Sequence, residues 1–388
     1  MQDAIIVGGG LAGLVSALEL ARSGHAVTLV ERKTYPFHKV CGEYVSNEVK
    51  AYIESLGVDL VGLGAVNIRR FQVSAPSGRL LESRLDLGGF GISRYVLDYE
   101  LYRLGLTAGV QFRLGKAVDD VTFADDRFAV TLNDGTTLAS QLVLGTFGKR
   151  SKLDKSLGRS FVGRHMANRT SYIGVKYHVR VDLPDDVIAL HNFSDGYCGI
   201  SAIEYGKYCV CYLTARENLR RHGNIPDMER AILHRNPHLK SIFTTARFLY
   251  DKPEVINEIS FAPKRAVENH ILMAGDSAGL ITPLCGNGMA MAIHGAKLVS
   301  DLSSAFLRNQ LTRVELESRY QRGWSERFTR RLWVGRTVQK LFGKPWLTEA
   351  GAWAFGAFKP ALRTVMRQTH GAVIPVSTSA IPSAGGFC

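Results

Sequence analysis

The sequence predicts an α/β protein in which two domains are closely associated, and three observations support this prediction. With 388 residues, the chain is longer than one minimal core requires. Its N-terminal residues read as strand, glycine-rich turn, helix and strand, whereas residues 161–262 are mostly predicted as strands. From Met289 onward the pattern is largely helical. Hydrophobic residues make up 46% and charged residues 21%, a balance that is typical of folded globular proteins.

The N-terminal unit begins with a short apolar strand over residues 3–7 and continues with an amphipathic helix over residues 14–23. Gly24 is placed to end that helix, and residues 26–30 predict the second strand. The turn between the first strand and the helix, Gly8-Gly9-Gly10-Leu11-Ala12-Gly13, fits the pattern G-x-G-x-x-G. In this context the pattern predicts a Rossmann-type dinucleotide-binding unit.

Each glycine of that pattern has a physical role. Gly8 permits the tight turn, Gly10 lets the backbone approach a pyrophosphate, and Gly13 lets the helix pack closely on the strand. The N–H groups at the start of the helix then bind the phosphate oxygens. Glu31, at the end of the second strand, can accept hydrogen bonds from both ribose hydroxyls. Because that carboxylate would repel a 2′-phosphate, the predicted ligand is not NADP.

The remaining elements follow from local patterns and turn residues. We predict strands and hairpins at residues 66–87, 110–145, 161–262 and 271–274. We predict helices at residues 46–56 and 93–106, with Ser46 and Ser93 as N-caps, and a single helical interval near residues 227–235. After Met289, helix breaks are expected at Gly343, Pro345 and Pro360, followed beyond Gly371 by a weakly ordered tail.

A second glycine-rich stretch follows the strand predicted at residues 271–274. It reads Gly275-Asp276-Ser277-Ala278-Gly279 and then Pro283-Leu284-Cys285-Gly286-Asn287-Gly288-Met289. Asp276 can accept a hydrogen bond from a sugar-like hydroxyl, and Gly286 to Met289 offer N–H groups at a helix start. A simple nicotinamide dehydrogenase does not need this second site, whereas a long cofactor with a ribityl chain and a tricyclic ring does. The sequence therefore favours FAD over NAD.

Together, these motifs resemble those of the glutathione-reductase-type FAD flavoproteins. Within them the chain is similar to the group of aromatic hydroxylases (para-hydroxybenzoate hydroxylase-like), flavin halogenases and geranylgeranyl reductases. The loop Lys39-Val40-Cys41-Gly42-Glu43 resembles the cysteine-glycine loop of the geranylgeranyl reductase branch. The resemblance covers roughly residues 1–300. It implies an FAD-binding domain assembled from residues 1–65, 94–158 and 264–300, a β-sheet substrate domain from residues 66–93 and 159–263, and a helical C-terminal region and tail over residues 301–388.

The resemblance also implies which residues bind FAD. The ADP half would be held by Gly8, Gly10, Ala12, Gly13, Glu31 and Arg32. Arg94 would reach the phosphate and ribityl region, and Val118 would contact adenine through its backbone. Asp276 would bind the ribityl chain, and the edge of the isoalloxazine would meet Gly286, Gly288 and Met289.

Cys41 is the candidate catalytic residue, because the family loop that carries it passes near the flavin ring. The alternative is a buried small hydrophobic residue. His38 and Glu43 flank the loop and are candidate proton donors, with a solvated role as the alternative. Cys285 is predicted to pack beside the flavin turn. No metal site is predicted, because Cys209 and Cys211 are not accompanied by a second ligand pair and read as core residues.

One departure from the family concerns the electron donor. Family hydroxylases carry an Asp-Gly motif in mid-chain that is associated with both FAD and NAD(P)H. Here the stretch is Gly145-Thr146-Phe147-Gly148-Lys149-Arg150-Ser151, with Phe147 in place of the acid. The donor is therefore NAD(P)H, a separate reductase or a small diffusible reductant.

Two enzyme reactions and one non-enzymatic role fit a protein of this kind. A reductase would deliver a hydride from reduced FAD to a carbon–carbon double bond of a lipid-like or secondary-metabolite substrate. A monooxygenase would use O₂ to hydroxylate an aromatic or polyketide substrate. A halogenase is disfavoured, because the Trp-x-Trp-x-Ile-Pro stretch is missing. The third reading is a non-catalytic flavin-binding redox module. The Cys41 loop favours the reductase.

The net charge of +13 is concentrated near the C-terminus. Between Arg319 and Arg367, basic residues alternate with aromatic ones, including Trp324, Trp333 and Trp346. One reading is peripheral contact with an anionic membrane through residues 319–367, and the other is helices that pack their aromatic side chains inward. Nucleic acid binding is disfavoured, because no recognisable module is present. The chain start does not have the pattern of a signal peptide, so we expect a cytoplasmic protein, with the inner face of the membrane as the peripheral site.

Overall fold

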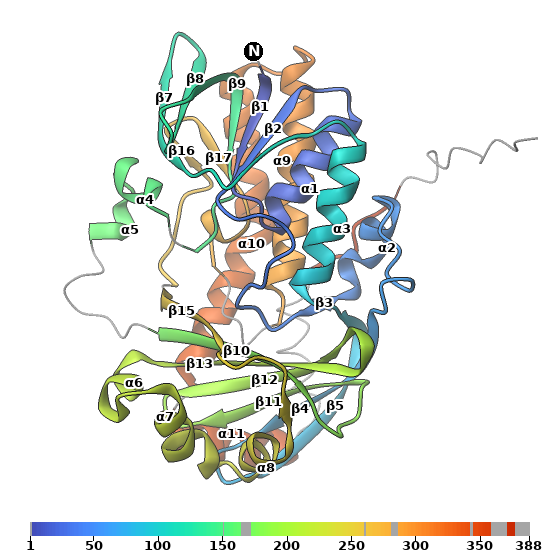
Figure 1. The fold of residues 1–388 in the computed structure, drawn as a ribbon, viewed down its shortest axis with the longest axis vertical. Coiled ribbons are helices and arrows are strands. Elements are labelled where there is room, and N and C mark those ends of the chain that lie inside the picture. Colours follow the sequence, from blue (N-terminus) through green and yellow to red (C-terminus); the bar gives the residue numbers. More distant parts are fainter. Residues whose placement is uncertain are drawn as a thin grey trace, which may run out of the picture.

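Two β-sheets at opposite ends of the molecule form the framework of the protein, a computed structural model of which is shown in Figure 1. The structure describes residues 2–149, 151–163, 172–259, 261–280, 286–341, 344–357 and 371–376. Of the positions named above, Arg150, Pro283, Leu284, Cys285, Gly343, Pro360 and Arg367 lie outside these residues. Within the described residues, no helix has both the length and the apolar character needed to cross a bilayer.

The first sheet is the Rossmann-type sheet that the glycine motif predicts. Its strands run in the order β16–β17–β9–β1–β2–β6, and β1 pairs in parallel with both β2 and β9. The bounds are β1 (Gln2–Val7), β2 (Val27–Glu31), β6 (Gln111–Leu114), β9 (Thr137–Gly145), β16 (Val267–Glu268) and β17 (Ile271–Met273). An antiparallel extension is formed by β7 (Val118–Ala124) and β8 (Arg127–Leu132).

Long helices cover this sheet and bury an apolar core against it (Figure 1). They are α1 (Leu11–Arg22), α3 (Arg94–Thr107), α9 (Gly288–Leu307) and α10 (Arg313–Leu341). The helical spacing of apolar residues explains why α1 forms on this sheet, because Leu14, Val15 and Leu18 are fully buried beneath strands β1 and β2. Ser93 caps α3 by accepting a hydrogen bond from the Val96 amide, as the sequence predicts.

The second sheet runs β14–β10–β13–β12–β11–β4–β5–β3, with β15 paired to β10. Its bounds are β3 (Tyr44–Ser46), β4 (Val66–Ser74), β5 (Leu80–Gly91), β10 (Tyr172–Arg180), β11 (Val187–Phe193), β12 (Gly196–Ile203), β13 (Lys207–Ala215), β14 (Arg247–Phe248) and β15 (Glu254–Ile259). The hairpin predicted over residues 66–87 is present as β4 and β5. Strand β3 belongs to this sheet although it lies within residues 1–65, which the sequence assigns to the cofactor domain.

The helix predicted near residues 227–235 is present, but it is not a single helical interval, because further helices lie on either side of it. Three helices, α6 (Arg216–His222), α7 (Ile225–Ile232) and α8 (Pro237–Thr245), pack on the face of the second sheet that is turned away from the first. Asparagine N-caps with a proline in the first helical turn mark two of these helices: Asn224 caps α7, and Asn236 caps α8. The remaining helical elements are η1 (Asn47–Val49), α2 (Lys50–Ser55), α4 (Leu153–Ser156), α5 (Ser160–Gly163), η2 (Glu204–Gly206), η3 (Leu233–Arg235), η4 (Gly275–Ser277) and α11 (Pro345–Ala357).

A buried carboxylate connects the C-terminal residues to the body of the protein. Glu48 accepts hydrogen bonds from the Arg331 guanidinium at 2.8 Å and from the Gly371 amide at 2.6 Å. The Glu48 carbonyl accepts a third bond from the Ile374 amide, and His294 Nε2 lies 3.4 Å from the carboxylate. Burial alone would raise the pKa of Glu48, but His294, Arg331 and Gly371 together lower it to about 2.

We expect Glu48 to make the stability of the protein depend on pH. Its pKa in the folded protein lies below the ordinary value of 4.5, so its contribution is complete above pH 4.5 and is lost as the pH falls toward 2. That contribution corresponds to about 3 kcal/mol. Urea unfolding of Glu48→Gln at pH 7 should show a loss of about 3 kcal/mol, with a weaker fall below pH 4.5 than in the wild type. Equal stability of both proteins at pH 7 would contradict this account.

Candidate functional site

A cavity of about 880 Å³ lies between the two sheets. The carboxyl ends of β1, β2 and β9 open onto it, and the inward face of the second sheet forms its other wall. Ligand sites in open parallel sheets form at this edge, and this volume is near the upper end of the range of roughly 300–1,000 Å³ for such sites. All the predicted cofactor-binding residues except Gly13 line the cavity.

The first glycine turn fixes the start of α1 at the cavity wall. Gly8 has a φ of +106°, and a Cβ there would lie 2.6 Å from the Thr146 carbonyl oxygen. A Cβ at Gly13 would lie 2.0 Å from the Gly8 oxygen, so Gly13 acts by packing and not by lining the cavity. At Gly10, a Cβ would meet only Lys39 Nζ at 3.8 Å and an Arg94 nitrogen at 4.0 Å. The helix start is therefore open to an anion and has two cations beside it.

Glu31 lies where the family motif requires a ribose-binding acid. Its side chain is almost fully buried and accepts hydrogen bonds from the Gly9 amide at 2.7 Å and the Lys33 amide at 3.1 Å. These bonds hold the carboxylate at the cavity wall, which Arg32 and Val118, at the start of β7, also line. A carboxylate has enough lone pairs to accept two ribose hydroxyls in addition.

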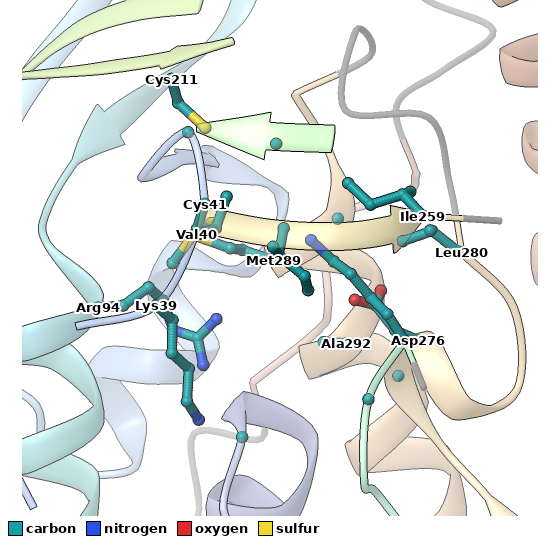
Figure 2. A pocket seen from close by; sticks show the side chains of 18 of the residues that line it. Lys39, Val40, Cys41, Arg94, Cys211, Ile259, Asp276, Leu280, Met289 and Ala292 are labelled. Carbon is teal, nitrogen blue, oxygen red and sulfur yellow. The ribbon is translucent and has the colours of Figure 1, made fainter. Parts of the chain in front are cut away.

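The second glycine stretch meets the same cavity from the opposite side. Gly275 and Gly286 have φ values of +62° and +65°, which only glycine adopts readily. Asp276 follows the first of them, and Gly288 and Met289 begin α9. Figure 2 shows Asp276 on one side of the cavity and Lys39 with Arg94 on the other, with Met289 between them.

Arg94 and Lys39 share a buried carboxylate that sequence analysis missed. Arg94 donates to both oxygens of Asp98, at 2.6 and 2.7 Å, and Lys39 Nζ lies 3.2 Å from the same group. Lys39 also donates to the Gly9 carbonyl at 3.0 Å, and burial lowers its pKa. The i, i+4 spacing of Arg94 and Asp98 is the signal in the sequence that could have indicated this pair.

The Cys41 loop lies across the floor of the cavity. Cys41 is half-buried and lines the cavity, and its carbonyl oxygen accepts a contact from the Cys209 thiol at 3.2 Å. Cys211, on the same face of β13, also lines the cavity instead of lying wholly in the core (Figure 2). Glu43 is fully buried, so a solvated role for it is excluded.

Glu43, His178 and Cys209 bring their ligand atoms within 4.8 Å of one another, a spacing that could hold a metal ion. The Lys176 ammonium, however, lies 2.5 Å from Glu43 Oε1. Because this cation already neutralises the carboxylate, a metal ion would be repelled from the position it would occupy. We therefore propose no metal at this cluster.

Much of the rest of the floor is apolar. Strand β11 contributes Ile188 and Leu190, β13 contributes Leu213, and β15 contributes Ile259, with Leu280 above them. Phe71 and Val73 of β4 and Leu85 of β5 extend this surface toward the edge of the sheet. The cavity thus combines a charged end beside the Cys41 loop with an apolar end.

Comparison with known proteins agrees with this geometry. Residues 3–63 match the model of the pyridine nucleotide-disulphide oxidoreductase family. The chain is 24% identical to a menaquinone reductase of Mycobacterium tuberculosis, over 83% of this chain and 81% of that protein. It is 23% identical to digeranylgeranylglycerophospholipid reductase 2 of Methanopyrus kandleri, over 88% and 87%. It is 25% identical to conditioned medium factor receptor 1 of Dictyostelium discoideum, over 91% and 73%.

Solved structures show the same fold. A flavoprotein/dehydrogenase from Cytophaga hutchinsonii superposes with a TM-score of 0.77 at 15% identity, covering 94% of this chain and 92% of that one. A probable FAD-dependent monooxygenase from Pseudomonas aeruginosa superposes with a TM-score of 0.72 at 17% identity, covering 91% and 99%. The predicted α/β fold with an inserted β-sheet domain is thereby confirmed.

We expect Glu31→Gln to weaken the binding of FAD, the cofactor that these motifs imply. Glutamine can still accept the Gly9 amide, but it loses the charged acceptor for the ribose hydroxyls, which costs about 1.5–3 kcal/mol. Isothermal titration with FAD should then give a dissociation constant about 10- to 100-fold higher. The exposed Glu54→Gln is the matched control. Unchanged affinity in Glu31→Gln would show that Glu31 does not contact the cofactor.

Proposed function

Because the chain is an FAD-dependent oxidoreductase of the superfamily that includes geranylgeranyl reductases and aromatic hydroxylases, we propose that it reduces a carbon–carbon double bond of a lipid-like substrate. The observation that carries this proposal is the apolar end of the cavity, directly beside the Cys41 loop. Relatives named as reductases of menaquinone and of a polyprenyl phospholipid support it.

The cavity floor favours an apolar substrate on energetic grounds. Burying apolar surface contributes about 25 cal/mol per Å², so a long hydrocarbon chain gains affinity along the whole row from Leu190 to Phe71. An aromatic acid or a phenol would need polar partners for its substituents, and leaving one unpaired costs about 1–3 kcal/mol. Glu43, which lines the cavity beside Cys41, already bonds Lys176 and His178.

Different residues of the cavity bind FAD and the substrate. The start of α1 and the cations Lys39 and Arg94 bind the pyrophosphate, and Asp276 binds the ribityl chain. When bound, FAD supplies the hydride. Cys41 forms the part of the cavity wall that the reacting double bond contacts, and the apolar floor excludes water from that double bond.

The electron donor follows from the missing acid in mid-chain. Phe147 lines the cavity where family hydroxylases have the aspartate associated with NAD(P)H. We therefore infer that a separate reductase or a small diffusible reductant supplies the electrons, with direct reduction by NAD(P)H as the alternative.

Helix α11 provides a route to a membrane. Leu347, Thr348 and Gly351 line the cavity, whereas Trp346 and Trp353 are 69% and 67% exposed. Their spacing of seven residues puts both tryptophans on one side of α11. Tryptophan favours the membrane–water interface, and the net charge of +13 favours anionic lipid. We propose that α11 rests on an anionic membrane and passes the lipid chain into the cavity.

The reductase proposal predicts that an alkene reoxidises the reduced protein without oxygen. The FAD-loaded protein is photoreduced anaerobically and mixed with menaquinone or a polyprenyl lipid in detergent, and the flavin colour should return. In a parallel experiment the reduced protein is mixed with O₂ and phenols. Colour return and hydroxylated product only in the second experiment would replace the proposed reductase by a monooxygenase.

The same experiment tests Cys41. Cys41→Ala should retain full FAD content and reoxidise at least about tenfold more slowly, since its side chain lines the reacting part of the cavity. Cys198→Ala is the control, because that thiol is buried in the core of the second sheet. Unchanged turnover in Cys41→Ala would remove the residue from the reaction.

The membrane proposal predicts that the double variant Trp346→Ser, Trp353→Ser pellets less with anionic vesicles than the wild type does. Its partition coefficient should fall by about tenfold. Exposed Tyr205, 64% accessible and far from α11 in sequence, gives the control Tyr205→Ser. Pelleting is measured at low salt with phosphatidylglycerol vesicles and with neutral vesicles. Equal pelleting of all three proteins with anionic vesicles would contradict the role of α11, and no pelleting of the wild type would contradict membrane contact.

A further inference from the structure

A continuous hydrogen-bonded chain runs beneath the Cys41 loop, from the molecular surface to the charged end of the cavity. His38 is half-buried and stacks on Tyr95, which is 39% exposed. The Tyr250 hydroxyl lies 3.1 Å from His38 Nδ1 and 2.5 Å from His178 Nδ1. His178 Nε2 lies 2.6 Å from Glu43 Oε2. Each of these contacts is within hydrogen-bonding distance.

The chemistry of the partners sets the direction of the hydrogen bonds. Glu43 is held ionised, because Lys176 and His178 lower its pKa to about 2 although burial alone would raise it. An ionised carboxylate only accepts, so His178 Nε2 carries a hydrogen, and in the neutral ring Nδ1 then accepts from the Tyr250 hydroxyl. Burial raises the pKa of Tyr250, which keeps its hydroxyl protonated. The Tyr250 oxygen is then free to accept from His38.

A purely structural role does not explain this arrangement well. Lys176, His178 and Glu43 are all at most 2% exposed, and burying such charges costs several kcal/mol unless every partner is satisfied. Apolar residues of similar size would stabilise the same contact between loop and sheet at least as well. The chain also continues to His38, which lines the cavity and stands beside the exposed Tyr95.

We propose that His38, Tyr250 and His178 form a proton path that carries protons from solvent to Glu43, beside Cys41 in the cavity. This inference rests on the proposed function, because an apolar substrate that fills the cavity expels the water that would otherwise supply protons. Lys176 balances the charge of Glu43 between transfers. Glu43 is the end of the path that lies beside Cys41, and the other three act through it.

The path completes the balance of the proposed reaction. Reduction of a double bond adds a hydride to one carbon and a proton to the other, while the reduced cofactor is oxidised. The Nε2 proton of His178 moves to Glu43, the Tyr250 proton moves to His178 Nδ1, and a His38 proton moves to Tyr250. Solvent replaces the proton on His38, Glu43 gives its proton to the substrate carbon, and His178 is left with its hydrogen on Nδ1. After the product leaves, water that re-enters the cavity protonates Glu43, which returns a proton to His178 Nε2, while the Nδ1 proton goes back through Tyr250 and His38 to solvent.

The kinetic test uses the FAD-loaded protein, photoreduced and mixed anaerobically with the polyprenyl lipid. Tyr250→Phe should slow reoxidation at least about tenfold with unchanged FAD content, because the path is cut at its middle. Tyr177→Phe is the matched control: Tyr177 is on the opposite face of β10 and bonds Glu229 at 3.0 Å. His38→Ala should be slowed similarly and recover with added imidazole, which a structural role would not allow. A wild-type rate in Tyr250→Phe overturns the path.

A second measurement keeps the test independent of the substrate. Nitrogen NMR of histidine-labelled protein, with His178 assigned from His178→Gln, should show a neutral ring protonated at Nε2. Its Nδ1 resonance should shift in Tyr250→Phe and not in Tyr177→Phe. If the wild type reduces no alkene, the proposed function fails and this spectrum decides the path. Protonation at Nδ1, or no response to Tyr250→Phe, overturns it.

Discussion

The contact between two backbones, at the carboxyl ends of β1 and β9, positions the rest of the site. Thr146 donates its hydroxyl to the carbonyl oxygens of Val7, at 3.0 Å, and Gly8, at 2.6 Å. A side chain at Gly8 or Gly13 would separate these segments, because no Cβ fits there. This close approach aims the start of α1 at the cavity, so the partial positive charge of the helix faces the ligand. Glu31, Asp276, Lys39, Arg94 and the second glycine-rich stretch line the cavity at the same edge of the sheet.

The second sheet supplies what the Rossmann-type sheet cannot. The alternation of β10 sends Lys176 and His178 toward the cavity, while Val175 and Tyr177 pack beneath the helices on the other face. The same alternation in β11 and β13 gives an apolar surface a few residues away. One sheet face therefore presents an ionic end and an apolar end, and the Cys41 loop crosses between them. A cofactor and an apolar substrate can meet there, because the ionic end neutralises charge and the apolar end excludes water.

Local features of the fold and site could be predicted from the sequence, because they depend on few neighbours. The glycine turn, the acid at Glu31 and the caps at Ser46 and Ser93 each act within one turn of backbone. The pairs Lys39–Asp98 and Lys176–Glu43 could not be predicted, since the latter joins residues 133 positions apart through a sheet whose register no local pattern reveals. Helices α6 and α8 escape prediction for another reason. Only α8 has an Asn-Pro N-cap, whereas α6 begins after Ala215, whose side chain makes no cap hydrogen bond.

The central claim is that one FAD lies across the two glycine-lined helix starts, with Glu31 and Asp276 at its sugars. The most direct measurement is the visible absorption spectrum of the freshly isolated protein, followed by titration with FAD of the stripped, folded chain. The account predicts flavin absorption bands and saturable binding of a single FAD per chain. A correctly folded protein that is colourless and binds no added FAD would contradict it.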